Sequence, residues 1–241
     1  MITSDLIQRR LERFWGYGNL EAPVWFVGME EGLGKNRSAT DLEARLRATD
    51  GKATVDMRRD MMQVPDHIRF FRNGAPVQSS WKYPIALYLY LKNKKKPTKQ
   101  EIQEHQAFII GDSELKNNVA LELMPLPVHK TNEDAWIYNK YRISGLESRK
   151  KYLDTYKPGR VKELTRMINN YSPKLVIFYS IGYLPDWVRI VGCDIVQITR
   201  QMFFVKNGPT SFCVVPQGAS FGMSYDRIYE FAEKISGKIE I

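Results

Sequence analysis

Short, uninterrupted runs of apolar residues recur along this chain, separated by longer segments with helical periodicity. Residues 24–28 read VWFVG, residues 119–124 read VALELM and residues 174–180 read KLVIFYS. A strand that is apolar on both faces must be covered on both faces, as a parallel strand is between two helical layers. We therefore expect an α/β protein, a three-layer α/β/α sandwich around a mostly parallel central sheet of four to five strands.

The segments between these strands predict the helices of the two outer layers. Residues 3–15, 81–92 and 158–171 each place apolar side chains along one helical stripe. Thr98 followed by Glu101 matches a capping box, in which each side chain accepts a hydrogen bond from the other residue's backbone N–H. Another helix is therefore expected to begin directly after Thr98.

Three further signals predict the end of a strand, a hairpin turn and the start of a helix. VALELM is followed by Pro125 and Pro127, which lack the N–H groups of a strand ladder, so we expect the strand to stop there. Asn207-Gly208 lies between two apolar runs, which is typical of a β-hairpin. The last helix is expected to begin at Ser224.

In a sheet of parallel strands, ligands bind in the crevice outside the carboxyl ends of the strands. This rule selects the loops that follow Val27, Met124, Tyr179 and Val215. We expect the functional residues to come from these loops and from the segments that lie over them.

Length and cysteine content limit the class of protein. The 241 residues suit one α/β domain, residues 1–241. No apolar run approaches the ~18 residues that cross a membrane, and the N-terminus lacks the apolar stretch of a secretory signal. Cys193 and Cys213 are too few for a disulfide framework or a four-cysteine iron–sulfur cluster. We expect a monomeric, cytoplasmic protein without a metal or other cofactor.

The chain is basic, because 36 Lys and Arg against 27 Asp and Glu give a formal net charge of 36 − 27 = +9. This surplus favours a polyanionic partner, since neutralised phosphates release their counterions; ordinary solubility is the alternative explanation. The residues expected to contact DNA are Lys35, Arg37, Lys94, Lys95 and Lys96. The three consecutive lysines also follow a predicted helix, whose C-terminal dipole attracts cations.

The segment GMEEGLGKNR, residues 28–37, follows the first strand and is predicted to form a loop, because it combines three glycines with charged residues. A phosphate-binding P-loop has four residues between its first Gly and its Gly-Lys pair, whereas five separate Gly28 from Gly34 here. A GxGxxG pattern is also absent, and two glutamates would repel a pyrophosphate. The loop therefore fits neither kind of nucleotide site.

Four segments, in chain order, resemble the uracil-DNA glycosylase superfamily. Residues 18–32, GNLEAPVWFVGMEEG, resemble its opening strand and glycine loop. Residues 119–127 and 172–182 resemble its next two core strands, and residues 214–231 lie where a His-Pro-Ser motif precedes the terminal helix. The resemblance implies a uracil-DNA glycosylase-like fold, DNA as the partner, and hydrolysis of the N-glycosidic bond of a flipped base.

Two differences from the family's pattern concern the base. The first loop keeps only the family's glycines and has Glu30 and Glu31 between them. The last motif lacks its histidine and keeps Pro216, Gln217 and Ser220. These differences favour a damaged or modified base over plain uracil. The resemblance implies modified phage DNA as one source of such a base.

Glu30 and Glu31 are the predicted catalytic residues. Cleavage of an N-glycosidic bond passes through a sugar cation, and a positioned carboxylate stabilises that cation or orients the attacking water. Each glutamate could also raise the pKa of the other, because like charges repel. Two solvated loop glutamates are the alternative interpretation.

A flipped base needs hydrogen-bond partners and a stacking ring in its pocket. The resemblance implies a polar residue on the second strand, an aromatic residue after the first loop and polar groups in the last motif. The predicted base-binding residues are Asn118, Glu122, Phe70, Phe71, Trp81, His129, Gln217 and Ser220. His129 is the expected proton donor to the departing base, and His67 and His105 are alternatives.

We therefore predict a monofunctional DNA glycosylase that flips out a damaged or modified base and leaves an abasic site. The first alternative is a catalytically silent, nucleic-acid-binding protein of the same fold. The second alternative is a hydrolase or nuclease with Glu30, Glu31 and Glu122 around a divalent metal, which would depend on magnesium.

Overall fold

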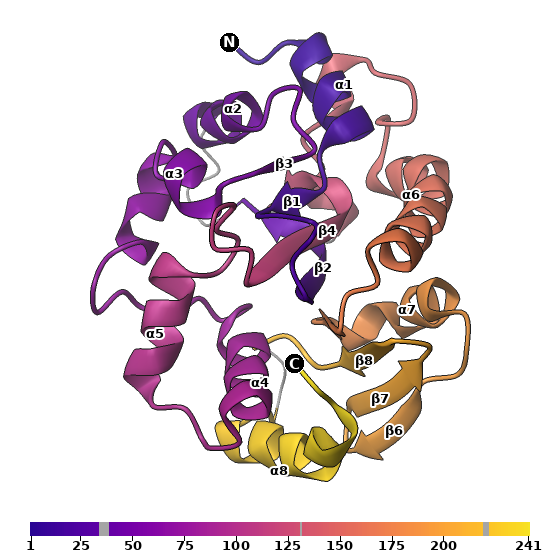
Figure 1. Ribbon diagram of the computed structural model, residues 1–241. Helices are drawn as coiled ribbons and strands as arrows, with labels where there is room; N and C mark the ends of the chain where they lie inside the picture. The colour runs from indigo at the N-terminus through magenta and orange to yellow at the C-terminus, as the bar shows by residue number, and fades with distance from the viewer. Residues whose placement is uncertain (34–38, 131, 219–221) are drawn as a thin grey trace.

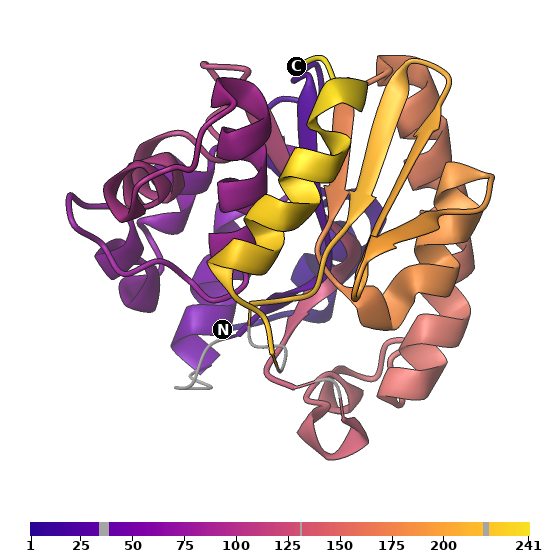
Figure 2. The ribbon, with the colours of Figure 1, turned by 90° about the horizontal axis from the view of Figure 1, so that it is seen from below.

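A mixed β-sheet runs through the molecule with helices on both of its faces (Figures 1 and 2). The computed structural model describes residues 1–33, 39–130, 132–218 and 222–241, and eight strands lie in these ranges. Their order across the sheet is β3-β1-β4-β2-β5-β8-β7-β6. The strands are β1 Gly16–Tyr17, β2 Val24–Gly32, β3 Thr54–Val55, β4 Asn118–Val128, β5 Leu175–Phe178, β6 Val196–Thr199, β7 Met202–Asn207 and β8 Thr210–Val214.

Most helices alternate with the strands along the chain. The α-helices in the described ranges are α1 Ser4–Arg13, α2 Ala39–Ala48, α3 Met57–Met61, α4 Lys82–Asn93, α5 Lys99–Phe108, α6 Arg149–Tyr171, α7 Leu184–Val191 and α8 Tyr225–Ile235. Short 3₁₀ helices are η1 Pro65–Phe70, η2 Glu133–Ala135, η3 Asn139–Tyr141, η4 Ile181–Tyr183 and η5 Ser236–Lys238.

The α/β class is confirmed, but the sheet is wider and more mixed than expected. Its four central strands, β4, β2, β5 and β8, are mutually parallel. Strand β1 pairs antiparallel with β4, and β6, β7 and β8 form an antiparallel meander. Two strands have only two residues, which is too short for a recognisable apolar run. The predicted hairpin is present, with Asn207 and Gly208 between β7 and β8.

Both faces of the central strands are buried, which explains their uninterrupted apolar runs. Phe26 packs on one face, edge-to-face against Tyr88 of α4, with the ring centroids 5.9 Å apart. Its neighbours Trp25 and Val27 point to the opposite face, where they join a core to which α1, α6 and α7 contribute. Alternate residues of one strand thus belong to two separate cores.

The predicted helix boundaries are correct where capping residues define them. Thr98 accepts from the Glu101 backbone N–H at 3.1 Å, and Glu101 accepts from the Thr98 N–H at 2.6 Å, which completes the capping box. Helix α8 begins at Tyr225, one residue after the predicted start, and Ser224 caps it. The helix expected over residues 158–171 is the second half of a longer helix, α6, which Ser148 caps and which contains Pro158.

The second strand does not stop at its prolines, so that prediction is wrong. Strand β4 continues through Pro125 and Pro127 because side chains bind its backbone there: Arg10 Nε donates to the Pro125 carbonyl and the Tyr138 hydroxyl to the Pro127 carbonyl, both at 2.7 Å. The Leu126 N–H likewise donates to a tyrosine hydroxyl, at 3.0 Å. These side-chain bonds give partners to the carbonyls of both prolines and to the N–H between them, so the backbone polar groups of this segment are satisfied.

The first strand also extends further than expected. Strand β2 runs to Gly32, so Glu30 and Glu31 lie at the end of a strand and not in the loop predicted over residues 28–37. The register with β4 shifts between Glu30 and Gly32, an irregularity of the kind that re-aims neighbouring side chains. Residues 34–38, with Lys35 and Arg37, lie outside the described ranges.

Within the described ranges, none of the helices combines the length and the apolar character that a membrane span requires.

Candidate functional site

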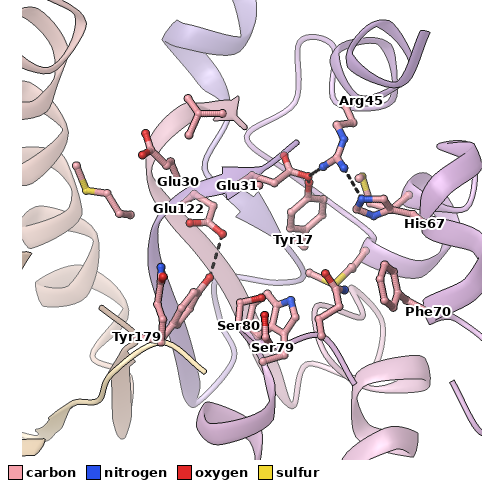
Figure 3. Close-up of a pocket in the computed structure, with 18 of the residues that line it drawn as sticks. Tyr17, Glu30, Glu31, Arg45, His67, Phe70, Ser79, Ser80, Glu122 and Tyr179 are labelled. Atoms are coloured by element: carbon pink, nitrogen blue, oxygen red, sulfur yellow. Dashed lines mark hydrogen bonds and ion pairs between the residues drawn. The ribbon is translucent and has the colours of Figure 1, made fainter. Parts of the chain in front are cut away.

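A cavity of about 480 Å³ opens at the carboxyl ends of the central parallel strands (Figure 3). Strand β2 lies between β4 and β5, so the chain continues first to one side of β2 and later to the other. Such a reversal of strand order leaves a crevice in which α/β proteins bind ligands. Eight predicted site residues line the cavity: Glu30, Glu31, Glu122, Phe70, Phe71, Trp81, His129 and Gln217.

Glu30 forms a buried, two-pronged ion pair with Arg149 at the start of α6. The two arginine nitrogens lie 2.9 and 2.5 Å from the two carboxylate oxygens, and both side chains are 5% exposed. Burial raises the pKa of Glu30, and the adjacent guanidinium offsets part of that shift. Glu30 is thereby fixed in one orientation and is not the solvated loop residue of the alternative interpretation.

Glu31 is the centre of a second group, which we call the Glu31 cluster: Glu31, Arg10, Arg45 and Tyr17. Arg10 donates at 2.8 Å, the Tyr17 hydroxyl at 2.9 Å, and Arg45 donates as well. Burial by itself would raise the pKa of Glu31, but the two guanidinium cations outweigh it and hold the pKa below its ordinary value. Glu31 is therefore a carboxylate at neutral pH.

The Glu31 cluster is built by helices that pack across the end of the sheet. Arg10 comes from α1 and is 1% exposed; besides Glu31 it binds Thr49 at 2.6 Å, and its guanidinium lies 3.9 Å from the ring centre of Phe14. Arg45 comes from α2 and also contacts the Nε2 atom of His67.

Glu122 lines the same cavity as Glu30 and Glu31, but it has no cationic partner. The Tyr179 hydroxyl lies 2.9 Å from Glu122 Oε1, and the two residues form what we call the Glu122 pair. Glu122 Oε2 is buried and has no hydrogen-bond partner. Burial raises the pKa of Glu122 to about 8, and the hydroxyl of Tyr179 opposes this shift only partly. Glu122 is thus mostly protonated at neutral pH.

Gly28 makes room for the Glu122 pair. It lies opposite Glu122 in the register of β2 with β4. A β-carbon at position 28 would overlap both Glu122 Oε2 and the Tyr179 hydroxyl. The first glycine of GMEEG is therefore needed for close side-chain approach and not for a turn.

The predicted stacking residues differ in how they face the cavity. Trp81 and Phe71 line it but belong to the core, with 7% and 4% of their surface exposed. Trp81 packs at 5.1 Å from the Tyr179 ring and 6.1 Å from Phe26. Phe70 is less buried, and the Arg69 guanidinium lies 4.8 Å from its ring centre. Phe70 thus offers the most accessible aromatic surface of the three.

Asn118 is not part of the cavity, which corrects its predicted place in the base pocket. It begins β4, at the opposite end of the sheet from the cavity, and is fully buried. Its side chain contacts His105 at 3.2 Å and accepts from the Gly111 N–H at 3.1 Å. Asn118 and the alternative donor His105 therefore hold the end of α5 against the sheet. His67 and His129, in contrast, both line the cavity.

The last predicted motif reaches the cavity through Gln217. A β-carbon on the next residue, Gly218, would overlap the Ser79 carbonyl, so this glycine lets the segment after β8 touch the segment before α4. Two walls of the cavity thus come from distant parts of the sequence. Ser220 lies outside the described ranges.

The lysine run lies far from the cavity. Helix α4 begins beside Ser80 and Trp81, and its 12 residues span about 18 Å before Lys94. Lys94 donates to the Ser236 carbonyl at 3.0 Å, Lys95 lies 3.8 Å from Glu101, and Lys96 lies over Tyr229. These lysines therefore do not surround the cavity mouth; Arg69 and Lys130 do line the cavity.

Sequence reasoning missed the residues that set the ionisation of the site: Arg10, Arg45, Arg149, Tyr17 and Tyr179. One signal was available. Arg10 lies three and four residues after Ile7 and Leu6, and four residues before Phe14, so it shares the apolar stripe of its helix. An arginine on that stripe has to find a buried anionic partner.

Among the described residues, no group of three or more His, Cys, Asp or Glu side chains is arranged to hold a metal ion. A search of known protein families and of curated proteins finds no match for the chain.

Proposed function

We propose that the protein is a DNA glycosylase that receives a flipped base in this cavity and hydrolyses its N-glycosidic bond. The observation that carries the proposal is the ionised Glu31, held rigidly beside a cavity that also presents aromatic rings and a protonated carboxyl group. A uracil-DNA glycosylase-like fold, with β4, β2, β5 and β8 as its parallel core, is part of the same proposal.

The size and lining of the cavity suit a nucleoside. Its volume of about 480 Å³ lies within the range of small-molecule sites, about 300–1,000 Å³. Phe70 offers a ring face for stacking, and Glu122, His129 and Gln217 offer polar groups for the base edge. Arg69 and Lys130 add positive charge for the phosphates on either side of the flipped nucleotide.

Glu31 is the group best placed to stabilise the sugar cation. Its negative charge does not depend on a proton leaving during the reaction, because its pKa is held low. The donors in the Glu31 cluster fix the carboxylate, so little reorganisation is needed when positive charge develops at the sugar. Glu30 and Arg149 support the same strand end through their ion pair.

The base itself is proposed from the departures described above, by analogy with the family. The glutamate pair and the absent histidine favour a damaged or modified base, and modified phage DNA is the source we propose for it. The biological role would then be antiviral defence, with no metal or other cofactor in the reaction.

The test uses single- and double-stranded DNA that carries uracil, hypoxanthine or phage-type modified cytosines. Release of the free base and formation of alkali-labile sites are measured with chelator and, in parallel, with magnesium. We expect base release in chelator, and a loss of about 10²-fold or more in Glu31→Gln. Glu230→Gln is the matched control, because Glu230 lies on the exposed face of α8, 2.8 Å from Lys234.

Three results would contradict the proposal in different ways. Release from none of the substrates would reject the glycosylase activity. Strict dependence on magnesium would favour the metal-dependent hydrolase or nuclease. Full activity of Glu31→Gln would keep the activity and reject the role of Glu31.

One observation favours a catalytically silent DNA-binding protein as the second candidate. Every oxygen of Glu30 and Glu31 already accepts from an arginine or a tyrosine, so the local negative charge is largely neutralised. Salt-dependent binding of modified DNA without base release would support this candidate.

A further inference from the structure

Glu122 is a buried ionisable group to which the proposed function assigns only a hydrogen bond to the base edge. It lies on β4, with 7% of its surface exposed, and lines the cavity. Glu30 pairs with Met124 in the sheet register, so Glu122 is two strand residues, about 6.6 Å, further from the strand ends. A base that enters from the strand ends would therefore meet Glu122 at the inner end of the cavity.

The two carboxyl oxygens of Glu122 have different surroundings. Oε1 lies 2.9 Å from the Tyr179 hydroxyl, which can donate to it (Figure 3). Oε2 is buried against Gly28 and has no hydrogen-bond partner. A buried polar atom without a partner is costly, so it indicates a group that a ligand completes. With Oε1 accepting from Tyr179, the acid proton is on Oε2, and no acceptor in the described ranges takes it.

Burial is the largest cause that keeps Glu122 protonated, and the groups that face it act in both directions. Tyr179 after β5 donates one hydrogen bond, which favours the carboxylate, and Arg10 of α1 adds a weaker attraction. Burial and the negative charges of Glu31 and Glu30 on β2 act in the opposite direction and dominate, so the pKa is about 8. A group with this pKa is well matched to proton donation near neutral pH.

Arg160 fixes the main chain at Glu122. Arg160 of α6 donates to the main-chain carbonyls of Glu122 and Leu123, at 2.9 and 2.7 Å, and its guanidinium lies over the ring of Trp15. This arginine binds the strand and not the carboxyl group. The backbone that carries Glu122 is therefore fixed by a cation that does not pair with its carboxyl group.

We propose that Glu122 is the proton donor to the leaving base, with its Oε2–H group bound to a neutral hydrogen-bond acceptor on that base. This inference rests on the proposed glycosylase function. As the glycosidic C–N bond breaks, its electron pair goes to the base, and the Glu122 proton moves to the acceptor, so the base leaves as a neutral molecule. Water adds to the sugar cation, and the proton that the water loses restores Glu122, which balances the hydrolysis.

The donor sets the class of substrate. A base that presents a carbonyl oxygen or an unprotonated ring nitrogen to the inner end of the cavity can accept from Oε2–H. A base that is already cationic, such as 7-methylguanine, leaves without protonation and gains little from Glu122. The site is therefore specific for neutral bases that are poor leaving groups.

The test compares Glu122→Gln with Glu230→Gln on DNA that carries uracil, hypoxanthine or phage-type modified cytosines and on 7-methylguanine DNA. Glutamine keeps the shape and a donor N–H but cannot transfer a proton, so kcat should fall by about 10²-fold or more while DNA affinity changes little. Any release of 7-methylguanine should be affected far less. Glu230→Gln should match the wild-type protein on both substrates.

The pH profile adds a readout that a purely structural role would not change. The wild-type kcat should fall as the pH rises through about 8, where Glu122 loses its proton. In Tyr179→Phe, which lacks the hydrogen bond that favours the carboxylate, this fall should move to higher pH. Infrared spectra should show a protonated-carboxyl band at pH 7 that Glu122→Gln lacks.

Base release with a fully active Glu122→Gln, or with a flat alkaline profile, would overturn this inference and leave the proposed function intact. The absence of the protonated-carboxyl band would overturn it as well. Failure to release a base from every substrate would reject both proposals together.

Discussion

The Glu31 cluster and the Glu122 pair are two buried carboxyl sites that line one cavity, and they ionise in opposite ways. Glu31 has three donors, two of them cationic, and its pKa lies below the ordinary value. Glu122 has one neutral partner, and its pKa rises to about 8. Burial is common to both, so the number and charge of the donors decide which group is ionised. Because their pKa values differ, Glu31 can act as the anion and Glu122 as the acid in one cavity.

The largest expected effect comes from the removal of one cation of the Glu31 cluster. Arg10→Met leaves a buried carboxylate with one guanidinium fewer, and we expect a loss of about 3–5 kcal/mol in the free energy of unfolding. Arg9→Met is the matched control, because Arg9 lies next to Arg10 but pairs with Asp50 at the surface, so its replacement should change the stability far less. Equal losses of unfolding free energy in Arg10→Met and Arg9→Met, measured by chemical denaturation, would show that the Glu31 cluster stabilises the fold no more than a surface ion pair.

The contribution of Glu122 to the free energy of unfolding should fall as the pH rises, whereas the lowered pKa of Glu31 predicts the opposite dependence. Because the pKa of Glu122 is higher in the folded protein, the stability that protonated Glu122 contributes is present below about pH 4.5 and is lost progressively up to about pH 8. Glu122→Gln avoids this loss, so its free energy of unfolding should exceed that of the wild-type protein by about 2 kcal/mol or more at pH 9. The measurement is urea denaturation from pH 5 to pH 9. A difference that does not grow with pH would contradict the assigned protonation.

The space around the Glu122 pair can be tested through its glycine. Gly28→Ala places a methyl group against Glu122 Oε2 and the Tyr179 hydroxyl, so we expect a loss of about 1–3 kcal/mol and reduced ligand binding. Gly32→Ala is the control on the same strand, because a β-carbon there meets nothing within 4 Å. Thermal unfolding of the two variants side by side distinguishes them, and an undisturbed Gly28→Ala would argue against the close approach.

The smallest effect concerns DNA contacts away from the two carboxyl sites. Replacement of Lys94, Lys95 and Lys96 by Gln should weaken DNA binding about tenfold or less, because these lysines lie about 18 Å along α4 from the cavity. Replacement of Arg69 and Lys130, which line the cavity, should weaken it more. Affinities measured at several salt concentrations test this order. The reverse order would indicate that DNA binds at the C-terminal end of α4.

Local sequence signals predicted the elements well where a side chain and its own backbone decide the structure. Thr98 with Glu101, Ser224, and Asn207-Gly208 all form the caps and the hairpin that their chemistry favours. The extent of β2 and β4 could not be predicted in this way. The carbonyl of Pro125 is bound by Arg10, a residue more than a hundred positions away in the chain.

The sequence predicted several residues that line the cavity, but it did not predict their ionisation. Glu30, Glu31 and Glu122 do line one cavity, because the parallel strands bring their carboxyl ends together. Their ionisation depends on Arg10, Arg45 and Arg149, which helices supply from outside those strands. Asn118 was misplaced because its strand runs in the direction that puts it at the other end of the sheet.

The contact between Gly218 and Ser79 has a consequence for how a ligand could be found. The cavity has walls from both halves of the chain, so it exists only in the folded protein. A molecule that fills it adds RT ln(1 + [L]/Kd) to the folding free energy, about 2.7 kcal/mol at a hundredfold excess over Kd. The melting temperature therefore acts as a detector, and a library of free nucleosides can be screened by heat before any reaction is known.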